Sequence, residues 1–104
     1  LGYGGDGRDW LRGAGGDDRL WGDGEADVLF GDDGNDRLSG GDDDDALAGG
    51  RGDDQLFGGA GDDGIQGGIG RDSAWGADGN DRIEGEGGDD RLFGQAGNDS
   101  IEGG

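Results

Sequence analysis

The feature that most constrains this chain is a nine-residue repeat that runs from Gly4 to Glu102 without an insertion or a deletion. Its eleven complete copies all have glycine at position one and aspartate at position six. Position eight is leucine or isoleucine in ten copies, with Ala74 as the exception, and position four is glycine in all but two, where Glu25 and Asp43 stand. A fixed period of this kind is typical of a solenoid, in which each repeat is one structural unit stacked on its neighbours.

Composition alone would favour disorder, because the 104 residues have a net charge of −19 and only 27% hydrophobic content. A disordered linker gains nothing from an unbroken period, so the repeat overrules that reading. The absence of proline excludes collagen, and the absence of histidine and cysteine excludes zinc sites, thiolate nucleophiles and disulfides. The negative charge argues against nucleic acid or an anionic membrane as a partner, and no apolar run approaches the roughly 18 residues of a membrane span.

Each repeat divides into a turn and a short strand. The first six positions are rich in glycine, aspartate and asparagine, which favour turns. The last three read x-aliphatic-x, which predicts a three-residue strand with one side chain inward and two outward. Because one aliphatic residue per repeat cannot form a core alone, successive repeats must stack, and two repeats per coil would give two short parallel sheets.

The full pattern is Gly-Gly-x-Gly-x-Asp-x-aliphatic-x, which residues 49–57 and 58–66 match at every position. With this pattern the chain resembles the RTX (repeats-in-toxin) calcium-binding nonapeptide-repeat family over essentially its whole length. The resemblance implies an all-β fold, a right-handed parallel β-roll (a β-solenoid) with Ca²⁺ between the loops on each edge. We expect residues 1–104 to form one such module, a segment of a longer protein, with partial repeats at both ends.

The resemblance also implies the ligands. Each ion would take the carbonyls of positions two and four and the Asp of one loop, with the carbonyls of positions one and three and the Asp of the loop 18 residues later. The first site would join Gly5, Gly7 and Asp9 to Gly22, Gly24 and Asp27. The aspartates are Asp9, Asp18, Asp27, Asp36, Asp45, Asp54, Asp63, Asp72, Asp81, Asp90 and Asp99. The position-four glycines with candidate ligand carbonyls are Gly7, Gly16, Gly34, Gly52, Gly61, Gly70 and Gly79. The position-one glycines with candidate ligand carbonyls are Gly22, Gly31, Gly40, Gly49, Gly58, Gly67, Gly76, Gly85 and Gly94.

Ligand chemistry also favours calcium. Carboxylate and carbonyl oxygens in flexible loops suit a hard cation with six or more contacts, whereas Mg²⁺ retains its waters in smaller sites. Stacking would create about nine sites, and nine Ca²⁺ would nearly neutralise the charge of −19. One thin aliphatic column cannot offset the ordering of the whole backbone, so we expect folding to require the metal. Loops with Glu25, Asp43, Arg8 or Arg71 should bind most weakly.

All seven aromatic residues fall at outward strand positions. Tyr3 and the even-numbered repeats should place aromatic rings on one sheet, beside Arg19, Arg37 and Arg91, with Trp21, Phe57, Trp75 and Phe93 as the candidate partner-binding residues. Such a column either stabilises the sheet by stacking and cation–π contacts or docks a flanking domain, another copy or a glycan.

These features indicate a non-catalytic, calcium-induced folding module of a secreted, extracellular protein. The resemblance implies type I secretion, with an attached toxin or enzyme activity that the repeats do not specify. The alternative is a spacer or self-associating segment of an adhesin, surface-layer protein or extracellular filament. An enzyme is disfavoured because a roll should offer no apolar pocket to raise a carboxylate pKa.

Overall fold

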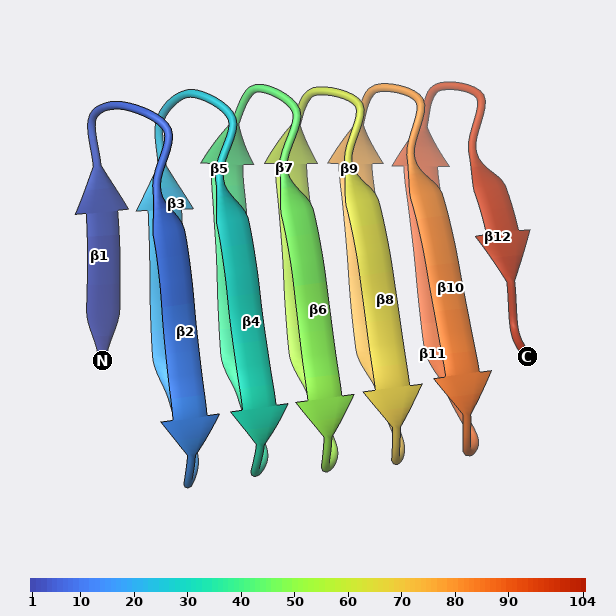
Figure 1. The fold of residues 1–104 in the computed structure, drawn as a ribbon. Helices are drawn as coiled ribbons and strands as arrows, with labels where there is room; N and C mark the ends of the chain where they lie inside the picture. The colour runs from blue at the N-terminus through green and yellow to red at the C-terminus, as the bar shows by residue number, and fades with distance from the viewer.

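The computed structural model describes residues 1–104 and contains strands but no helix (Figure 1). Twelve strands form two six-stranded parallel sheets. Sheet 1 has the order β1-β3-β5-β7-β9-β11, and sheet 2 has the order β12-β10-β8-β6-β4-β2. The strands are β1 (Gly2–Gly5), β2 (Trp10–Gly15), β3 (Arg19–Asp23), β4 (Val28–Asp33), β5 (Arg37–Asp42), β6 (Ala46–Arg51), β7 (Gln55–Ala60), β8 (Gly64–Ile69), β9 (Ser73–Asp78), β10 (Arg82–Gly87), β11 (Arg91–Ala96) and β12 (Ser100–Glu102).

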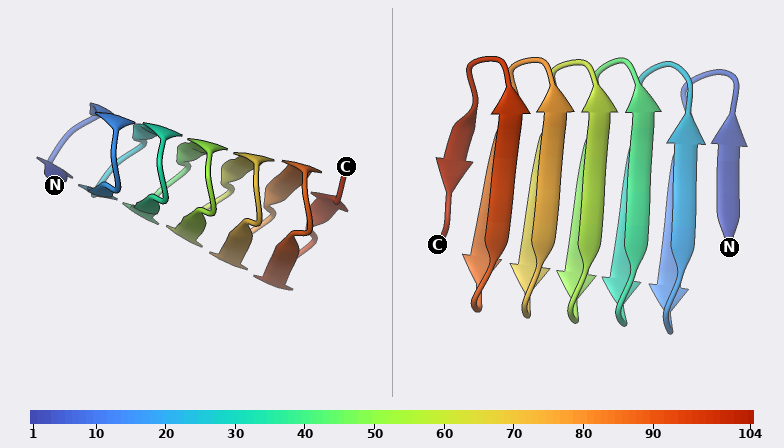
Figure 2. Two further views of the ribbon diagram at one scale, coloured as in Figure 1. Left: turned by 90° about the horizontal axis from the view of Figure 1, so that it is seen from below. Right: turned by 180° about the vertical axis from the view of Figure 1, so that it is seen from behind.

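Consecutive strands lie in opposite sheets, so the chain winds as a coil of two nonapeptides (Figure 2). The register confirms the 18-residue step, because Leu38 pairs with Leu56, and Leu56 pairs with Ala74. The molecule is a flat plate of 33 × 33 × 12 Å across its Cα atoms. This arrangement confirms the expected β-solenoid of two parallel sheets.

The core is the column of position-eight side chains between the sheets. Eight of them, from Leu20 to Ile83 and including Ala74, are at most 3% exposed. The column thins at both ends, where Leu11 and Leu92 are partly buried and Ile101 is 46% exposed. Coils at the ends have a neighbour on one side only, so fewer of the aliphatic residues are fully buried than the repeat predicts.

The strands are longer than the sequence predicts. Nine of the twelve contain six residues rather than three, because each continues through positions one, two and three of the following repeat. The position-one glycine lies in the strand, and most of these glycines are buried. The turn is therefore confined to the segment around positions four to six.

Positions two and four have positive φ angles in every repeat, whichever residue is present. Eight residues other than glycine adopt this conformation, with φ between 66° and 80°. They are Ala14, Asp23, Glu25, Asp32, Asp43, Ala77, Glu86 and Gln95. Residues with a Cβ are disfavoured in this left-handed region, so the sequence departs from the glycine pattern at a conformational cost.

The structure contains no helix with the length and hydrophobicity needed to cross a membrane.

Candidate metal centre

The position-six aspartates form two columns, one along each edge of the plate. One edge carries Asp9, Asp27, Asp45, Asp63, Asp81 and Asp99, and the other carries Asp18, Asp36, Asp54, Asp72 and Asp90. The seven aspartates from Asp27 to Asp81 are no more than 3% exposed. Neighbours in a column are joined directly: the backbone N–H of Asp45 donates to Oδ1 of Asp63 over 2.8 Å.

The second carboxylate oxygen of these aspartates has no hydrogen-bond partner. Oδ2 is buried and unpaired in every aspartate of the two columns from Asp9 to Asp90. A buried carboxylate oxygen without a donor is costly, and protein interiors almost always satisfy such atoms. Ten repetitions of the same unpaired atom therefore indicate a ligand that the protein chain does not itself supply.

A carbonyl oxygen from the next coil lies close to the unpaired oxygen. A Cβ placed on Gly4 would lie 2.8 Å from Oδ2 of Asp9 and 2.8 Å from the carbonyl oxygen of Gly22. A Cβ on Gly49 would meet Oδ2 of Asp54 at 2.5 Å and the Gly67 carbonyl oxygen at 2.6 Å. The invariant glycine at position one is thus required by space, since its φ angle is not positive, and two oxygens from successive coils converge beside it.

The structure brings together only some of the oxygens predicted to bind an ion at the first site, and not all of them are free of hydrogen bonds. Asp9, Asp27 and the carbonyl of Gly22 are adjacent, because Asp9 N–H donates to Asp27 Oδ1 over 2.8 Å. The Gly5 carbonyl already accepts the N–H of Gly24 at 3.3 Å. No group of three or more acidic side chains is placed to hold an ion by itself, so a site at these edges must include backbone oxygens.

Position-four carbonyls face the gap between successive loops. The carbonyl oxygen of Gly34 faces Gly52 on the next coil, and that of Gly52 faces Gly70. Each lies so close that a Cβ on the later glycine would clash with it. The carbonyl of Asp43 is placed in the same way beneath Gly61, although Asp43 is not itself a glycine. A side chain at position four therefore still leaves its carbonyl directed at the next coil.

Burial raises the pKa of the central aspartates in the absence of ions. The pKa reaches about 6 for Asp45 and Asp54 and about 7 for Asp63, and the pKa of Asp36, Asp72 and Asp81 is also raised. Loss of hydration is the largest cause, the hydrogen bond from the preceding coil opposes it, and neighbouring carboxylates add repulsion. A carboxylate pKa is therefore raised in this roll without an apolar pocket around it, because the stacked coils themselves exclude water.

A second ladder of hydrogen bonds, which the nonapeptide pattern does not predict, runs along the loops at position five. Oδ1 of Asp17 accepts the N–H of Asn35 over 2.8 Å, and Oδ1 of Asn35 accepts the N–H of Asp53 over 2.8 Å. Its direction is opposite to that of the position-six ladder. The available signal was the Asp or Asn at position five in eight of eleven repeats. Arg71 has no side-chain acceptor, so this column ends there.

The donor set suits a hard cation: carboxylate and carbonyl oxygens only, on loops that repeat at constant spacing. The family model for the RTX calcium-binding nonapeptide repeat, in a four-copy form, matches residues 3–38, 39–74 and 75–104. The chain belongs to this RTX repeat family. No curated protein and no solved structure matched the chain. RTX repeats bind Ca²⁺, in modules typical of secreted proteins.

The RTX roll has an aromatic column on sheet 1. The rings of Tyr3 and Trp21 stack with centroids 4.9 Å apart, and Trp75 stacks on Phe57 at 4.7 Å and on Phe93 at 5.8 Å. Ser39 interrupts the column, and Arg37 lies 4.9 Å from the centroid of the Phe57 ring. The predicted stacking and cation–π contacts are therefore present.

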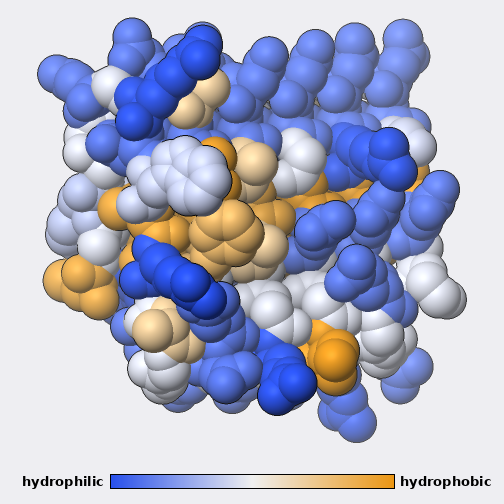
Figure 3. All heavy atoms as spheres, viewed as in Figure 1, coloured by the Kyte–Doolittle hydropathy of each residue, from blue (hydrophilic) through white to orange (hydrophobic).

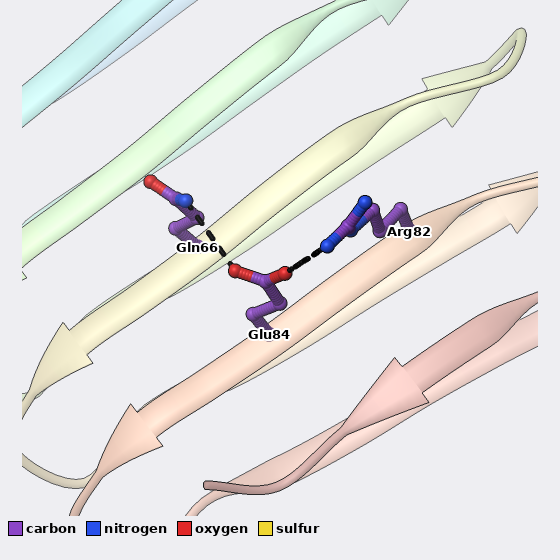
Figure 4. A network of polar contacts seen from close by, with 3 residues as sticks. All are labelled: Gln66, Arg82 and Glu84. Carbon is purple, nitrogen blue, oxygen red and sulfur yellow. Dashed lines mark hydrogen bonds and ion pairs between the residues drawn. The ribbon is translucent and has the colours of Figure 1, made fainter.

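The outer face of sheet 2 changes character along the RTX roll. Trp10 contacts Phe30 on the β2–β4 side, where apolar residues gather (Figure 3). Toward β10 the face is polar, and Glu84 accepts hydrogen bonds from Arg82 at 2.7 Å and from Gln66 at 3.4 Å (Figure 4).

Proposed function

We propose that this chain is a calcium-induced folding module in which ions bind between successive loops on both edges. The observation that supports this most strongly is the set of ten buried Oδ2 atoms without a partner. A divalent cation beside these oxygens would offset their lost hydration and the repulsion within each aspartate column. Without the cation, a hydrophobic core of only eight residues would have to offset the lost hydration and the repulsion of the aspartates.

The proposed ligands are the carboxylates of Asp9 to Asp99 and the loop carbonyls of positions one and four. Position two is a weaker candidate, because the Gly5 carbonyl is already engaged by Gly24. Stacking gives five gaps between loops on one edge and four on the other, so we propose about nine ions. Their charge would nearly cancel the −19 of the chain.

The proposed setting is outside the cell. Extracellular calcium modules bind with dissociation constants of roughly 10⁻⁴–10⁻³ M, so the chain would stay unfolded at low calcium and fold after export, as in type I secretion. The RTX β-roll is a structural calcium-binding domain, and we propose that this one has no catalytic activity of its own. An activity would reside in attached sequence.

Calcium titration of the chelator-treated protein tests this function. Far-ultraviolet circular dichroism should change from a disordered to a β spectrum as Ca²⁺ is added, and calorimetry should count about nine ions per chain. Mg²⁺ at equal concentration is the matched control and should give little β structure, since the loops offer no compact octahedral site. An identical β spectrum in chelator and in calcium would refute the proposal.

A self-associating structural segment is the second candidate. It is favoured by the aromatic column of sheet 1, of which Tyr3 remains 63% and Phe93 45% exposed. Exposed aromatic surface of this extent is typical of interaction sites.

A further inference from the structure

The outer face of sheet 2 contains an apolar hollow of about 450 Å³. It lies over β6 and β8, where the outward residues Ala46, Ala48 and Gly64 are too short to cover the layer beneath. Phe30 on β4 lines one end and Glu84 on β10 lines the other. The hollow is open to solvent and forms part of the apolar patch seen in Figure 3.

Sheet 1 presents the converse shape on the opposite face of the plate. Phe57, Trp75 and Phe93 stand on three successive strands of that sheet and stack as one ridge, with centroid steps of 4.7 and 5.8 Å. Their ring faces are turned toward one another, which leaves ring edges outward. A glycan would need the ring faces, so the ridge is better suited to insertion into an apolar hollow than to sugar stacking.

The two shapes have matching lengths, because both follow the strand spacing of about 4.8 Å. The ridge spans two strand steps, from Phe57 on β7 to Phe93 on β11. The walls of the hollow, Phe30 on β4 and Glu84 on β10, are three strand steps apart. The ridge of one molecule therefore fits between the walls of the hollow of another when their strands run side by side.

The charges on the two faces distinguish the possible face-to-face pairings of two molecules. Positions seven and nine of sheet 1 include Arg19, Arg37 and Arg91 but no Asp or Glu, although the chain as a whole is strongly acidic. Two copies of sheet 1 face to face would oppose only arginines. The polar end of the sheet 2 hollow is lined by Glu84 and its ion-pair partner Arg82. Glu102 lies beside Glu84 on the next strand, β12, and takes part in none of the ion pairs within the chain. When sheet 1 faces sheet 2, the arginines of one copy meet these glutamates of the other, whereas sheet 1 against sheet 1 offers no opposite charge.

We propose that calcium-bound copies of this chain stack face to face, with the Phe57–Trp75–Phe93 ridge of one in the sheet 2 hollow of the next. Each broad face measures 33 × 33 Å, which is larger than the ~800 Å² per partner of a stable interface. The contact joins two different surfaces, so it does not close and extends into a column of plates. This inference rests on the proposed calcium-dependent fold, since neither face exists in an unfolded chain.

Sedimentation velocity over a concentration series in saturating Ca²⁺ tests the stacking. The native mass should rise with concentration. Two variants should associate about tenfold or more weakly: Trp75→Ser, which copies Ser39 of the same column, and the double variant Ala48→Gln with Gly64→Gln, which fills the hollow. Ile69→Ser is the control, because Ile69 is 64% exposed but belongs to neither surface. Phe93→Ser replaces Trp75→Ser if circular dichroism shows that the latter does not fold.

A mixing experiment distinguishes two unlike surfaces from one self-complementary surface. The Trp75→Ser variant keeps an intact hollow and the hollow-filled variant keeps an intact ridge, so their mixture should form 1:1 dimers that do not extend. Native-like association by the hollow-filled variant alone would instead indicate pairing through sheet 1 and overturn the proposal. So would a chain that folds in calcium, by circular dichroism, yet stays monomeric throughout. A chain that does not respond to calcium would fail the proposed function first.

Discussion

The backbone N–H of Asp36 donates to Oδ1 of Asp54, 2.7 Å away on the next coil. The same bond repeats up both edges, so each interior aspartate uses one oxygen to fix the coil below it. The other oxygen is left buried and unpaired. One side chain thus sets the spacing of the loops and presents a negative oxygen to the gap between them, which couples the stacking of the coils to cation binding.

Asp54→Asn should weaken calcium-induced folding strongly. Asp54 is 1% exposed and its Oδ2 is unpaired, so the change removes a proposed ligand charge from the middle of a column. The calcium midpoint measured by circular dichroism should rise several-fold, and calorimetry should count at least one ion fewer. Asp53→Asn is the matched control, because Asp53 is exposed and Asn35 already occupies the same column. Equal midpoints for the two variants would contradict the assignment of position six.

Gly49→Ala should destabilise the roll even though the backbone there needs no positive φ. The new Cβ would lie 2.5 Å from Oδ2 of Asp54 and 2.6 Å from the Gly67 carbonyl oxygen. Overpacking of this kind costs about 1–3 kcal/mol, which thermal unfolding in saturating calcium can measure. Gly64→Ala is the control, since nothing lies within 4 Å of its Cβ position. A loss of stability of the same size in both variants would mean that space at position one is not the constraint.

Ala77→Gly should stabilise the calcium-bound roll by up to about 1 kcal/mol. Ala77 has φ of 78°, where a Cβ is strained and glycine is not. The gain is partly offset by the greater freedom of glycine in the unfolded chain. The same substitution at Ala48, in a strand without positive φ, should destabilise by roughly 0.5–1 kcal/mol. Calcium-saturated melting temperatures that fall for both variants would argue against strain at position two.

Acid should partly replace calcium. The pKa of Asp63 in the ion-free roll is raised to about 7, and that of Asp45 and Asp54 to about 6, above the unfolded value of about 3.9. Because the pKa of these carboxyl groups is higher in the folded than in the unfolded chain, protonation stabilises the fold. This stabilisation is complete when the pH is below the unfolded pKa, and it is lost as the pH rises through about 6 to 7. In chelator, β structure should therefore appear on acidification from pH 8 toward about 4.

The same protonation should raise the calcium midpoint as the pH falls below about 7, because protons and Ca²⁺ compete for the same carboxylates. Circular dichroism in chelator and calcium titrations at several pH values measure both effects. A chelated chain that stays disordered down to pH 4, together with a calcium midpoint independent of pH, would contradict the raised pKa values.

Much of the candidate site could be predicted because aspartate at position six never varies. An 18-residue coil places identical positions in one column, so the stacking of Asp36 on Asp54 follows from counting. The position-five ladder was less visible, since Arg8, Ala26 and Arg71 interrupt it. Its bonds depend on the direction of the backbone N–H at Asn35 and Asp53, which residue types alone do not specify.

The period established the two sheets, the aliphatic column and the aspartate edges, because a solenoid repeats one local geometry and so converts sequence spacing into spatial neighbours. Three features depended on the folded backbone. They are the six-residue length of the strands, the different roles of the two oxygens of each aspartate (one accepts a hydrogen bond and the other is unpaired), and the hollow on the face opposite the aromatic ridge. Where a strand ends and which carboxylate oxygen is engaged depend on the directions of backbone C=O and N–H groups, and these directions are fixed only when successive coils are in contact. The hollow arises where Ala46, Ala48 and Gly64 of adjacent strands happen to lie side by side, a consequence of packing across coils rather than of the motif.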